Sequence, residues 1–97
     1  MRLKPDEIRR IEDPHHPRGY REWVGRKELD RRRQSLIDRP GIKRCYVCHG
    51  ELRFADGSPT LEHILPKGAG GSTHDDHMDN LALSHWRCNT EKGSRRI

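Results

Sequence analysis

Two short stretches decide how this chain folds, Cys45-Tyr46-Val47-Cys48 and His85-Trp86-Arg87-Cys88. Each stretch pairs two metal-ligand side chains across two intervening residues, a spacing typical of the tight turns that chelate zinc. Together they offer three sulfur donors and one imidazole, which suits one tetrahedral zinc ion. We therefore predict that Cys45, Cys48, His85 and Cys88 hold a structural zinc. The alternative is that His85 lies on the surface and Cys88 is a small buried apolar residue.

The first pair also fits two other patterns. His49 follows Cys48 and completes the C-x-x-C-H pattern of haem attachment, and a C-x-x-C pair occurs in redox proteins. Haem would need an export route and an apolar pocket, and redox chemistry would need a surrounding βαβ pattern. The sequence shows no sign of an export route, an apolar pocket or a βαβ pattern. An odd number of cysteines without an export signal also argues against a disulfide framework.

The composition explains why a metal would help this chain to fold. Of its 97 residues, 30% are hydrophobic and 36% are charged, so a large apolar core is excluded. The apolar runs are far shorter than the about 20 residues of a membrane span, and the first residues lack an apolar signal segment. We expect one small cytoplasmic protein. The net charge of +5 favours nucleic acid as its partner.

The basic excess lies in the first 40 residues, which hold 12 Lys or Arg and 8 Asp or Glu. Residues 41–97 hold 8 and 7. The sequence predicts a largely helical, basic N-terminal extension over 1–40. This prediction rests on a faint helical spacing up to Ile11, a proline-rich turn at 13–17 and a helix expected from 23 to 38. The run Arg31-Arg32-Arg33 is either a solvated helix face or an arm that contacts phosphates.

The pattern changes at Gly41. Strands are predicted near 51–54, at 60–65 and at 80–83, with a glycine-containing loop from 67 to about 79 and a last helix from about 84 or 86 to 92. This order predicts a small α+β domain over 41–97. The 36 residues between Cys48 and His85 are too many for a simple zinc-finger loop, so this segment must carry something more.

That segment contains an ordered set of motifs. They are Leu61-Glu62-His63-Ile64-Leu65-Pro66-Lys67, Gly70-Gly71, Asn80-Leu81, His85-x2-Cys88-Asn89 and Lys92-Gly93. As a set, they resemble the HNH endonucleases of the zinc-stapled kind, from Cys45 to about Arg96. The resemblance implies a ββα-metal core held by one structural zinc, and it does not cover residues 1–40.

The resemblance implies a metal-dependent DNA endonuclease that nicks or cuts with little sequence preference. His63 would be the general base, Glu62 and Asn89 would bind one divalent cation such as Mg²⁺ or Mn²⁺, and Asn80 would hold the His63 imidazole or the local loop. Five cations around the site would meet DNA phosphates, namely Lys67, Arg87, Lys92, Arg95 and Arg96. Small proteins of this kind are often phage-encoded, so the host cytoplasm and a partner such as packaging machinery are also implied.

The residue chemistry agrees with that interpretation. A histidine with an ordinary pKa of about 6.5 can accept a proton near pH 7. Carboxylate and amide oxygens suit a hard cation, which would therefore bind apart from the thiolates. The family more often has Asp where Glu62 stands, a second histidine at Asn89 and Cys at His85, and each departure could change the metal preference. Glu62 and His63 are neighbours, so they can share a site only where the strand twists or breaks.

Several alternatives remain open at this point. His63 could be a structural histidine, Asn80 an ordinary turn residue, and the run His74-Asp75-Asp76-His77 a polar loop or a second metal site. The chain could also be a non-catalytic zinc module that docks on nucleic acid, or an accessory subunit of a phage packaging or restriction complex. The intact set of base and metal ligands favours the enzyme.

Overall fold

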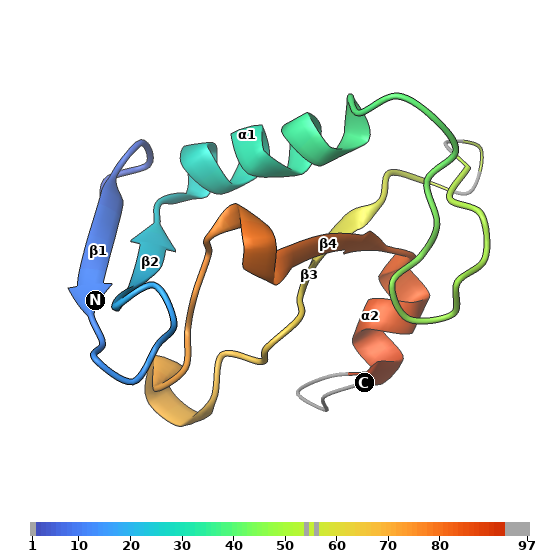
Figure 1. Cartoon of the computed structure of the whole chain (residues 1–97). Helices are drawn as coiled ribbons and strands as arrows, with labels where there is room; N and C mark the ends of the chain where they lie inside the picture. The colour runs from blue at the N-terminus through green and yellow to red at the C-terminus, as the bar shows by residue number, and fades with distance from the viewer. Residues whose placement is uncertain (1, 54, 56, 93–97) are drawn as a thin grey trace.

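The computed structural model describes residues 2–53, 55 and 57–92 (Figure 1). It is a small α+β structure with extents of 39 × 27 × 23 Å. The elements follow in the order β1 (Ile8–Glu12), β2 (Tyr20–Val24), α1 (Arg26–Ile37), β3 (Thr60–His63), the 3-10 helices η2 (Ala69–Gly71) and η3 (Met78–Asn80), β4 (Leu81–Ser84) and α2 (Trp86–Lys92). The small α+β class predicted from the sequence is confirmed.

The N-terminal region is a β-hairpin followed by a helix, so the prediction of a largely helical extension is wrong. Strands β1 and β2 pair antiparallel, with Ile8 opposite Val24 and Glu12 opposite Tyr20. The proline-containing segment between them closes the hairpin, because Asp13 N–H donates to Gly19 O at 3.0 Å. The turn predicted at 13–17 is therefore present, and it joins two paired strands.

Helix α1 begins after Gly25, at a point where two backbone segments touch. A Cβ atom on Gly25 would lie 2.0 Å from Lys4 O, so only glycine fits there. Pro5 O accepts hydrogen bonds from the first turn of the helix, at 2.9 Å from Lys27 N. The helix expected over 23–38 is thus present, with its first residues given over to β2. It crosses the top of the molecule in Figure 1.

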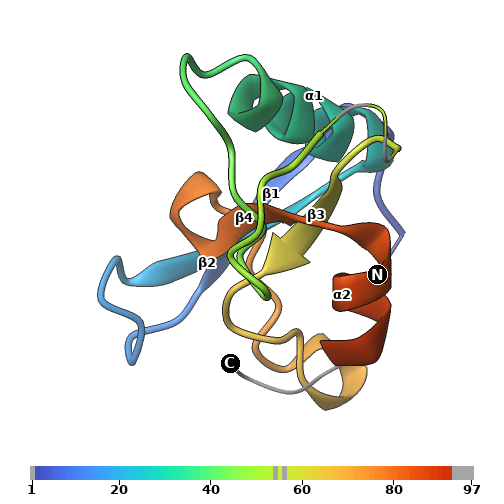
Figure 2. The same ribbon diagram turned by 90° about the vertical axis from the view of Figure 1, so that its right-hand side faces the viewer.

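The second sheet and helix α1 share one small core. Strands β3 and β4 pair antiparallel, with Thr60 opposite Ser84 and His63 opposite Leu81. Helix α2 lies against β3, which gives the ββα order expected for residues 60–92, and Figure 2 shows this unit from the side. Leu36 of α1 packs with Leu81 and Leu83 of β4. Residues 1–40 therefore contribute to the same core as the ββα unit, and the division at residue 40 stays a prediction.

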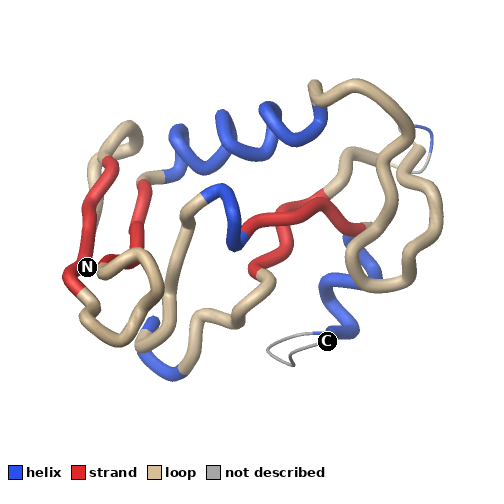
Figure 3. Tube along the Cα trace, viewed as in Figure 1, coloured by secondary structure: helices blue, strands red, loops and turns tan. Residues whose placement is uncertain are grey.

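Long loops connect these few elements, as the tan segments of Figure 3 show. The segment after α1 carries Cys45 and Cys48 toward the start of α2, and the segment from β3 to β4 passes beside the N-terminal hairpin. Among the described residues, no helix is long and apolar enough to cross a membrane.

Candidate active site and metal centre

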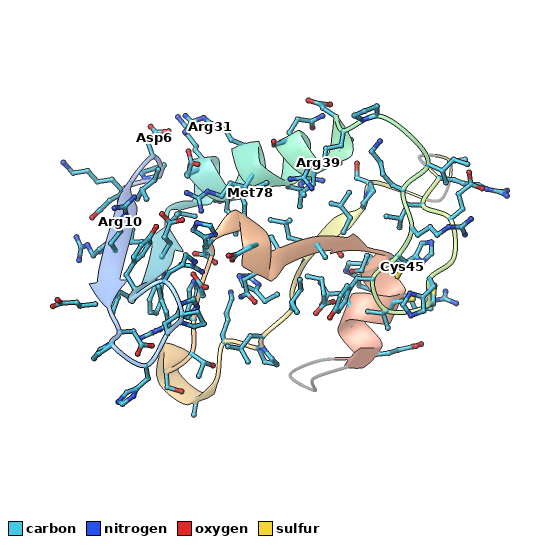
Figure 4. The ribbon with its side chains drawn as sticks, viewed as in Figure 1. Asp6, Arg10, Arg31, Arg39, Cys45 and Met78 are labelled. Atoms are coloured by element: carbon cyan, nitrogen blue, oxygen red, sulfur yellow. The ribbon has the colours of Figure 1, made fainter. Side chains whose placement is uncertain are left out.

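The two chelating pairs meet at the end of the molecule away from the hairpin, where Figure 4 labels Cys45. The ligand atoms of Cys45, Cys48, His85 and Cys88 all lie within 4.8 Å of one another. His85 Nδ1 is 3.4 Å from Cys48 Sγ and 3.7 Å from Cys88 Sγ. Zn–S bonds of about 2.3 Å and a Zn–N bond of about 2.0 Å give a tetrahedron edge of roughly 3.6 Å. The cluster therefore fits a structural zinc.

The groups around this cluster are arranged as they are around a bound metal. His85 Nε2 lies 3.2 Å from Glu51 O, so its proton is donated to that carbonyl and Nδ1 faces the sulfurs. Backbone N–H groups of Cys48 and His85 donate to Cys45 Sγ, and that of Gly50 donates to Cys48 Sγ, each at 3.4 Å. Such donors stabilise thiolates, which are the form of cysteine that binds zinc.

The thiol pKa values differ between the two chelating pairs. Burial alone would raise the pKa of Cys45, but the backbone N–H donors outweigh it and lower that pKa to about 6. Burial and the neighbouring sulfurs of Cys48 and Cys45 raise the pKa of Cys88 to about 11. Three thiolates can share this volume at neutral pH only with a positive charge among them.

The predicted base lies at the end of β3. The strand pairs regularly through its last two residues, Glu62 opposite Ala82 and His63 opposite Leu81. Neighbouring side chains in such a strand leave on opposite faces. Glu62 is buried, whereas the His63 side chain is half-buried and reaches the loop that joins β3 to β4.

The His63 imidazole ends on a buried carboxylate. His63 Nε2 lies 2.7 Å from Asp76 Oδ1, and His74 Nε2 lies 2.7 Å from Asp76 Oδ2. The backbone N–H of Val24 also donates to Oδ2, at 2.9 Å. Asp76 is only 1% exposed, and burial alone would raise its pKa. The hydrogen bonds from His63, His74 and Val24 outweigh burial and hold the pKa of Asp76 well below its usual range, so the carboxylate is ionised.

Strand β2 of the N-terminal hairpin fixes the loop that carries this carboxylate. Asp76 N–H donates to Glu22 O at 2.7 Å, and Glu22 N–H donates to Asp75 Oδ1 at 3.0 Å. The rings of Trp23 and His74 stack, with centroids 4.0 Å apart and planes 7° apart. The segment outside the resemblance therefore forms one wall of the candidate site.

Two arginines strengthen the contact between this wall and the loop. Arg32 of α1 donates to Asp76 O and to Glu22 Oε1, both at 2.7 Å. Arg21 of β2 donates to His74 O at 2.8 Å. Because these charge-assisted hydrogen bonds end on backbone carbonyls, they fix the backbone of the loop that carries His74 and Asp76.

Asn80 is buried at the end of η3 and binds the loop backbone. Its Oδ1 accepts from Leu65 N–H at 2.9 Å, and its Nδ2 donates to Asp75 O at 2.7 Å. The structure thus places Asn80 across both sides of the loop, next to the residues that reach His63. Its part in catalysis stays a prediction.

Asn89 joins α2 to β3. Its Nδ2 donates to Leu61 O at 2.9 Å and lies 3.3 Å from Thr60 Oγ1. The amide nitrogen is therefore turned toward the strand, and the amide oxygen is the atom with which Asn89 could bind a cation. Glu62 follows Leu61 directly, so the two predicted cation ligands come from adjacent stretches of α2 and β3.

The structure describes the side chains of two of the five basic residues that are predicted to contact DNA. Lys67 and Arg87 are exposed. The side chain of Lys92 and the whole of Arg95 and Arg96 lie outside the described residues.

Sequence reasoning missed His74 and Asp76 as partners of His63. The run from 74 to 77 is a polar loop, as expected, yet His74, Asp75 and Asp76 are all buried. The available signal was the density of the run, since four ligand-type residues in succession exceed what a solvated turn needs. The partner strand β2, some 50 residues earlier, has no comparable signal.

Comparison with known proteins bears on the ββα unit. A family model described as HNH endonuclease matches residues 45–95, which is more than half of the chain. The match begins at the first cysteine of the Cys45 cluster and spans β3, β4 and α2. No curated protein and no solved structure matches the chain.

Proposed function

The chain belongs to the HNH endonuclease family, and from that premise we propose that it is a metal-dependent DNA endonuclease with His63 as its general base. The observation that carries the proposal is the contact between His63 Nε2 and the ionised Asp76 carboxylate. A carboxylate accepts but cannot donate, so Nε2 holds the proton and Nδ1 is the imidazole nitrogen that could accept one.

This arrangement supports a simple hydrolytic step. His63 Nδ1 takes a proton from a water molecule, the water oxygen attacks the phosphorus atom, and the bond from phosphorus to the leaving oxygen breaks. Asp76 keeps the imidazole oriented and stabilises the imidazolium that forms. A base held in this way commonly contributes about 10²–10⁴ to the rate.

Membership of the family also implies a divalent cation. We assign it to the Glu62 carboxylate and the Asn89 amide oxygen, two hard donors from adjacent stretches of β3 and α2. Because Glu62 and His63 leave a regular strand on opposite faces, this assignment requires the chain to twist at His63, where β3 ends. The bound cation would neutralise charge on the phosphate and on the leaving oxygen. Mg²⁺ and Mn²⁺ are the ions that this donor set favours.

The remaining parts of the proposal follow from the fold. Zinc on Cys45, Cys48, His85 and Cys88 would join the segment after α1 to α2, which the small apolar core cannot do alone. Lys67 and Arg87 are exposed and would contact DNA phosphates. Low sequence preference, a cytoplasmic location, a phage origin and a packaging partner stay predictions.

Nicking of supercoiled plasmid tests the proposal. Wild-type protein with Mg²⁺ or Mn²⁺ should convert supercoiled DNA to open circles, and His63→Ala should be at least about 100-fold slower. His15→Ala is the matched control, because His15 is an exposed histidine in the hairpin turn. Equal rates for His63→Ala and wild type would exclude the catalytic role. DNA binding by wild type without cleavage under any divalent ion would favour the docking module instead.

A further inference from the structure

We propose that His63, His74 and Asp76 form a second metal site, which takes a transition-metal dication such as Zn²⁺ or Co²⁺. The site is separate from the Cys45 cluster and from the Glu62–Asn89 pair. One imidazole or carboxylate atom from each residue lies within 4.8 Å of the others. Two imidazole nitrogens and one carboxylate oxygen suit Zn²⁺, Co²⁺ and Ni²⁺, whereas Mg²⁺ and Ca²⁺ prefer oxygen ligands alone.

The three ligands are already held in place by different parts of the fold. Asp76 is fixed by the backbone of β2, through Val24 N–H on its carboxylate. The His74 ring is stacked on Trp23, and Gly71 lies against the same indole, because a Cβ there would be 2.7 Å from the Trp23 ring. His63 is fixed by the end of β3. Binding would therefore need little rearrangement.

Metal binding here would change only the tautomers of the two imidazole rings. In the hydrogen-bonded form, the Nε2 protons of His63 and His74 lie against the two Asp76 oxygens. A dication would occupy the place of those protons, and each neutral ring would keep its single proton on Nδ1 instead. The site then gains the positive charge that the ionised carboxylate attracts.

This exchange predicts inhibition, a consequence that rests on the proposed function. With its proton on Nδ1, His63 could no longer accept one from water. The same residue would thus be the base when bound only to Asp76 and inactive when bound to a transition metal. His74, for which the hydrolytic step has no use, would set the sensitivity of the enzyme to that metal.

Cobalt binding tests the site without reference to activity. Protein that already holds one zinc per chain is titrated with Co²⁺, and the visible bands of a nitrogen–oxygen site should appear without the near-ultraviolet band of sulfur ligation. His74→Gln should weaken this binding at least tenfold, since even the outer partners of metal ligands contribute 10- to 100-fold. Glutamine keeps an N–H donor for Asp76. His77→Gln changes a neighbouring histidine outside the cluster and should bind Co²⁺ like wild type.

The proposal is overturned if zinc-loaded wild type binds no cobalt, or if folded His74→Gln binds it as tightly as wild type. Should His74→Gln fail to fold, paramagnetic broadening in wild type decides instead. Broadening centred on the His63 and His74 rings supports the site, and broadening centred on His77 or His15 overturns it.

A nicking assay in Mg²⁺ with added Zn²⁺ separates the two proposals. Wild type should be inhibited at zinc concentrations about tenfold below those that inhibit His74→Gln. Cobalt binding with no nicking under any ion would leave the metal site standing and refute the nuclease. Nicking that zinc leaves unaffected, together with no cobalt binding, would do the reverse.

Discussion

Asp76→Asn separates the charge of the central carboxylate from its shape. Asparagine has almost the same size, but one of its two terminal groups donates and cannot accept. In the wild type, one Asp76 oxygen accepts from His63 and the other accepts from His74 and Val24 N–H. Whichever oxygen the amide nitrogen replaces, one imidazole must turn away or change its tautomer.

Two effects are expected, a loss of stability and a slower nicking rate. A hydrogen bond to a charged group contributes about 1.5–3 kcal/mol, and this change removes one outright and takes the charge from the others, so we expect a loss of about 2–4 kcal/mol in the free energy of unfolding. The nicking rate should fall about 100-fold, within the range that an oriented base contributes. The effect should lie in kcat, since Asp76 is buried and cannot reach DNA.

Nicking rates over a series of DNA concentrations give kcat and KM, and urea unfolding gives the stability. Asp79→Asn is the matched control, because the Asp79 carboxylate lies three residues further along the same loop and its side chain is 62% exposed. Folded Asp76→Asn that nicks within threefold of wild type would refute the link from Asp76 to the base. A rise in KM alone would show that Asp76 acts on DNA binding.

Three further changes probe other parts of the molecule. Removing zinc with a strong chelator should unfold the chain by far-ultraviolet circular dichroism, and added zinc should restore it; an unchanged spectrum contradicts the role of the Cys45 cluster. Trp23→Ala should cost about 2–4 kcal/mol of stability because the stacking of the indole on His74 is lost, whereas Trp86→Ala, at a residue 68% exposed, should cost under about 0.5 kcal/mol; equal costs in urea unfolding would be inconsistent with this wall. The hydrogen bond from Arg32, with one from Arg31, holds the pKa of Glu28 below 4.5, although burial opposes this. Ionised Glu28 therefore stabilises the fold above pH 4.5, and this contribution is lost as the pH falls through the folded-state pKa. Glu28→Gln should therefore be about 0.5–1 kcal/mol less stable at pH 7 and approach wild type in acid; a gap that is constant with pH argues against the pair.

The ββα unit was predictable because its signals are local. Cys45-x2-Cys48 and His85-x2-Cys88 each specify a turn, and their partnership follows from the coordination number of zinc. The order of Glu62-His63, Asn80 and Asn89 then predicts the family, which the match over residues 45–95 confirms. These residues carry their meaning in type and spacing, so no knowledge of the rest of the fold is needed.

The hairpin was not predictable for a physical reason that β2 illustrates. A strand usually reveals itself by apolar residues at every second position. In β2 the buried positions are Glu22 and Val24, and Glu22 is buried because Arg32 pairs with it at 2.7 Å. The inward face of β2 therefore carries a charged residue at a position where the alternation of a strand predicts an apolar one. In β1, Ile8 is 49% exposed, so its apolar residues do not mark a buried face either.

The polar loop was underestimated for a related reason. Asp75 and Asp76 are buried because backbone N–H groups of β2 bind their carboxylates, and a backbone has no signature in the sequence. The same feature explains why His63 could be chosen as the base while its orienting partner could not. That partner, Asp76, lies 13 positions after His63 and is fixed by a strand far earlier in the chain.

Three arginines of residues 1–40 are half-buried and pair with carboxylates of the fold. Arg18 pairs with Asp75 and Asp79, Arg21 pairs with Asp13, and Arg32 pairs with Glu22 and Glu28. A guanidinium already bound to a carboxylate contributes little to the attraction of a phosphate, because the two charges cancel at the distances that DNA would sample. The net charge of +5 already counts the paired carboxylates, so contacts with DNA phosphates are left to exposed residues such as Arg26, Lys27 and Arg39. What these three arginines supply instead is the position of the loop that carries Asp76, so the N-terminal region would also act on cleavage through the geometry of His63.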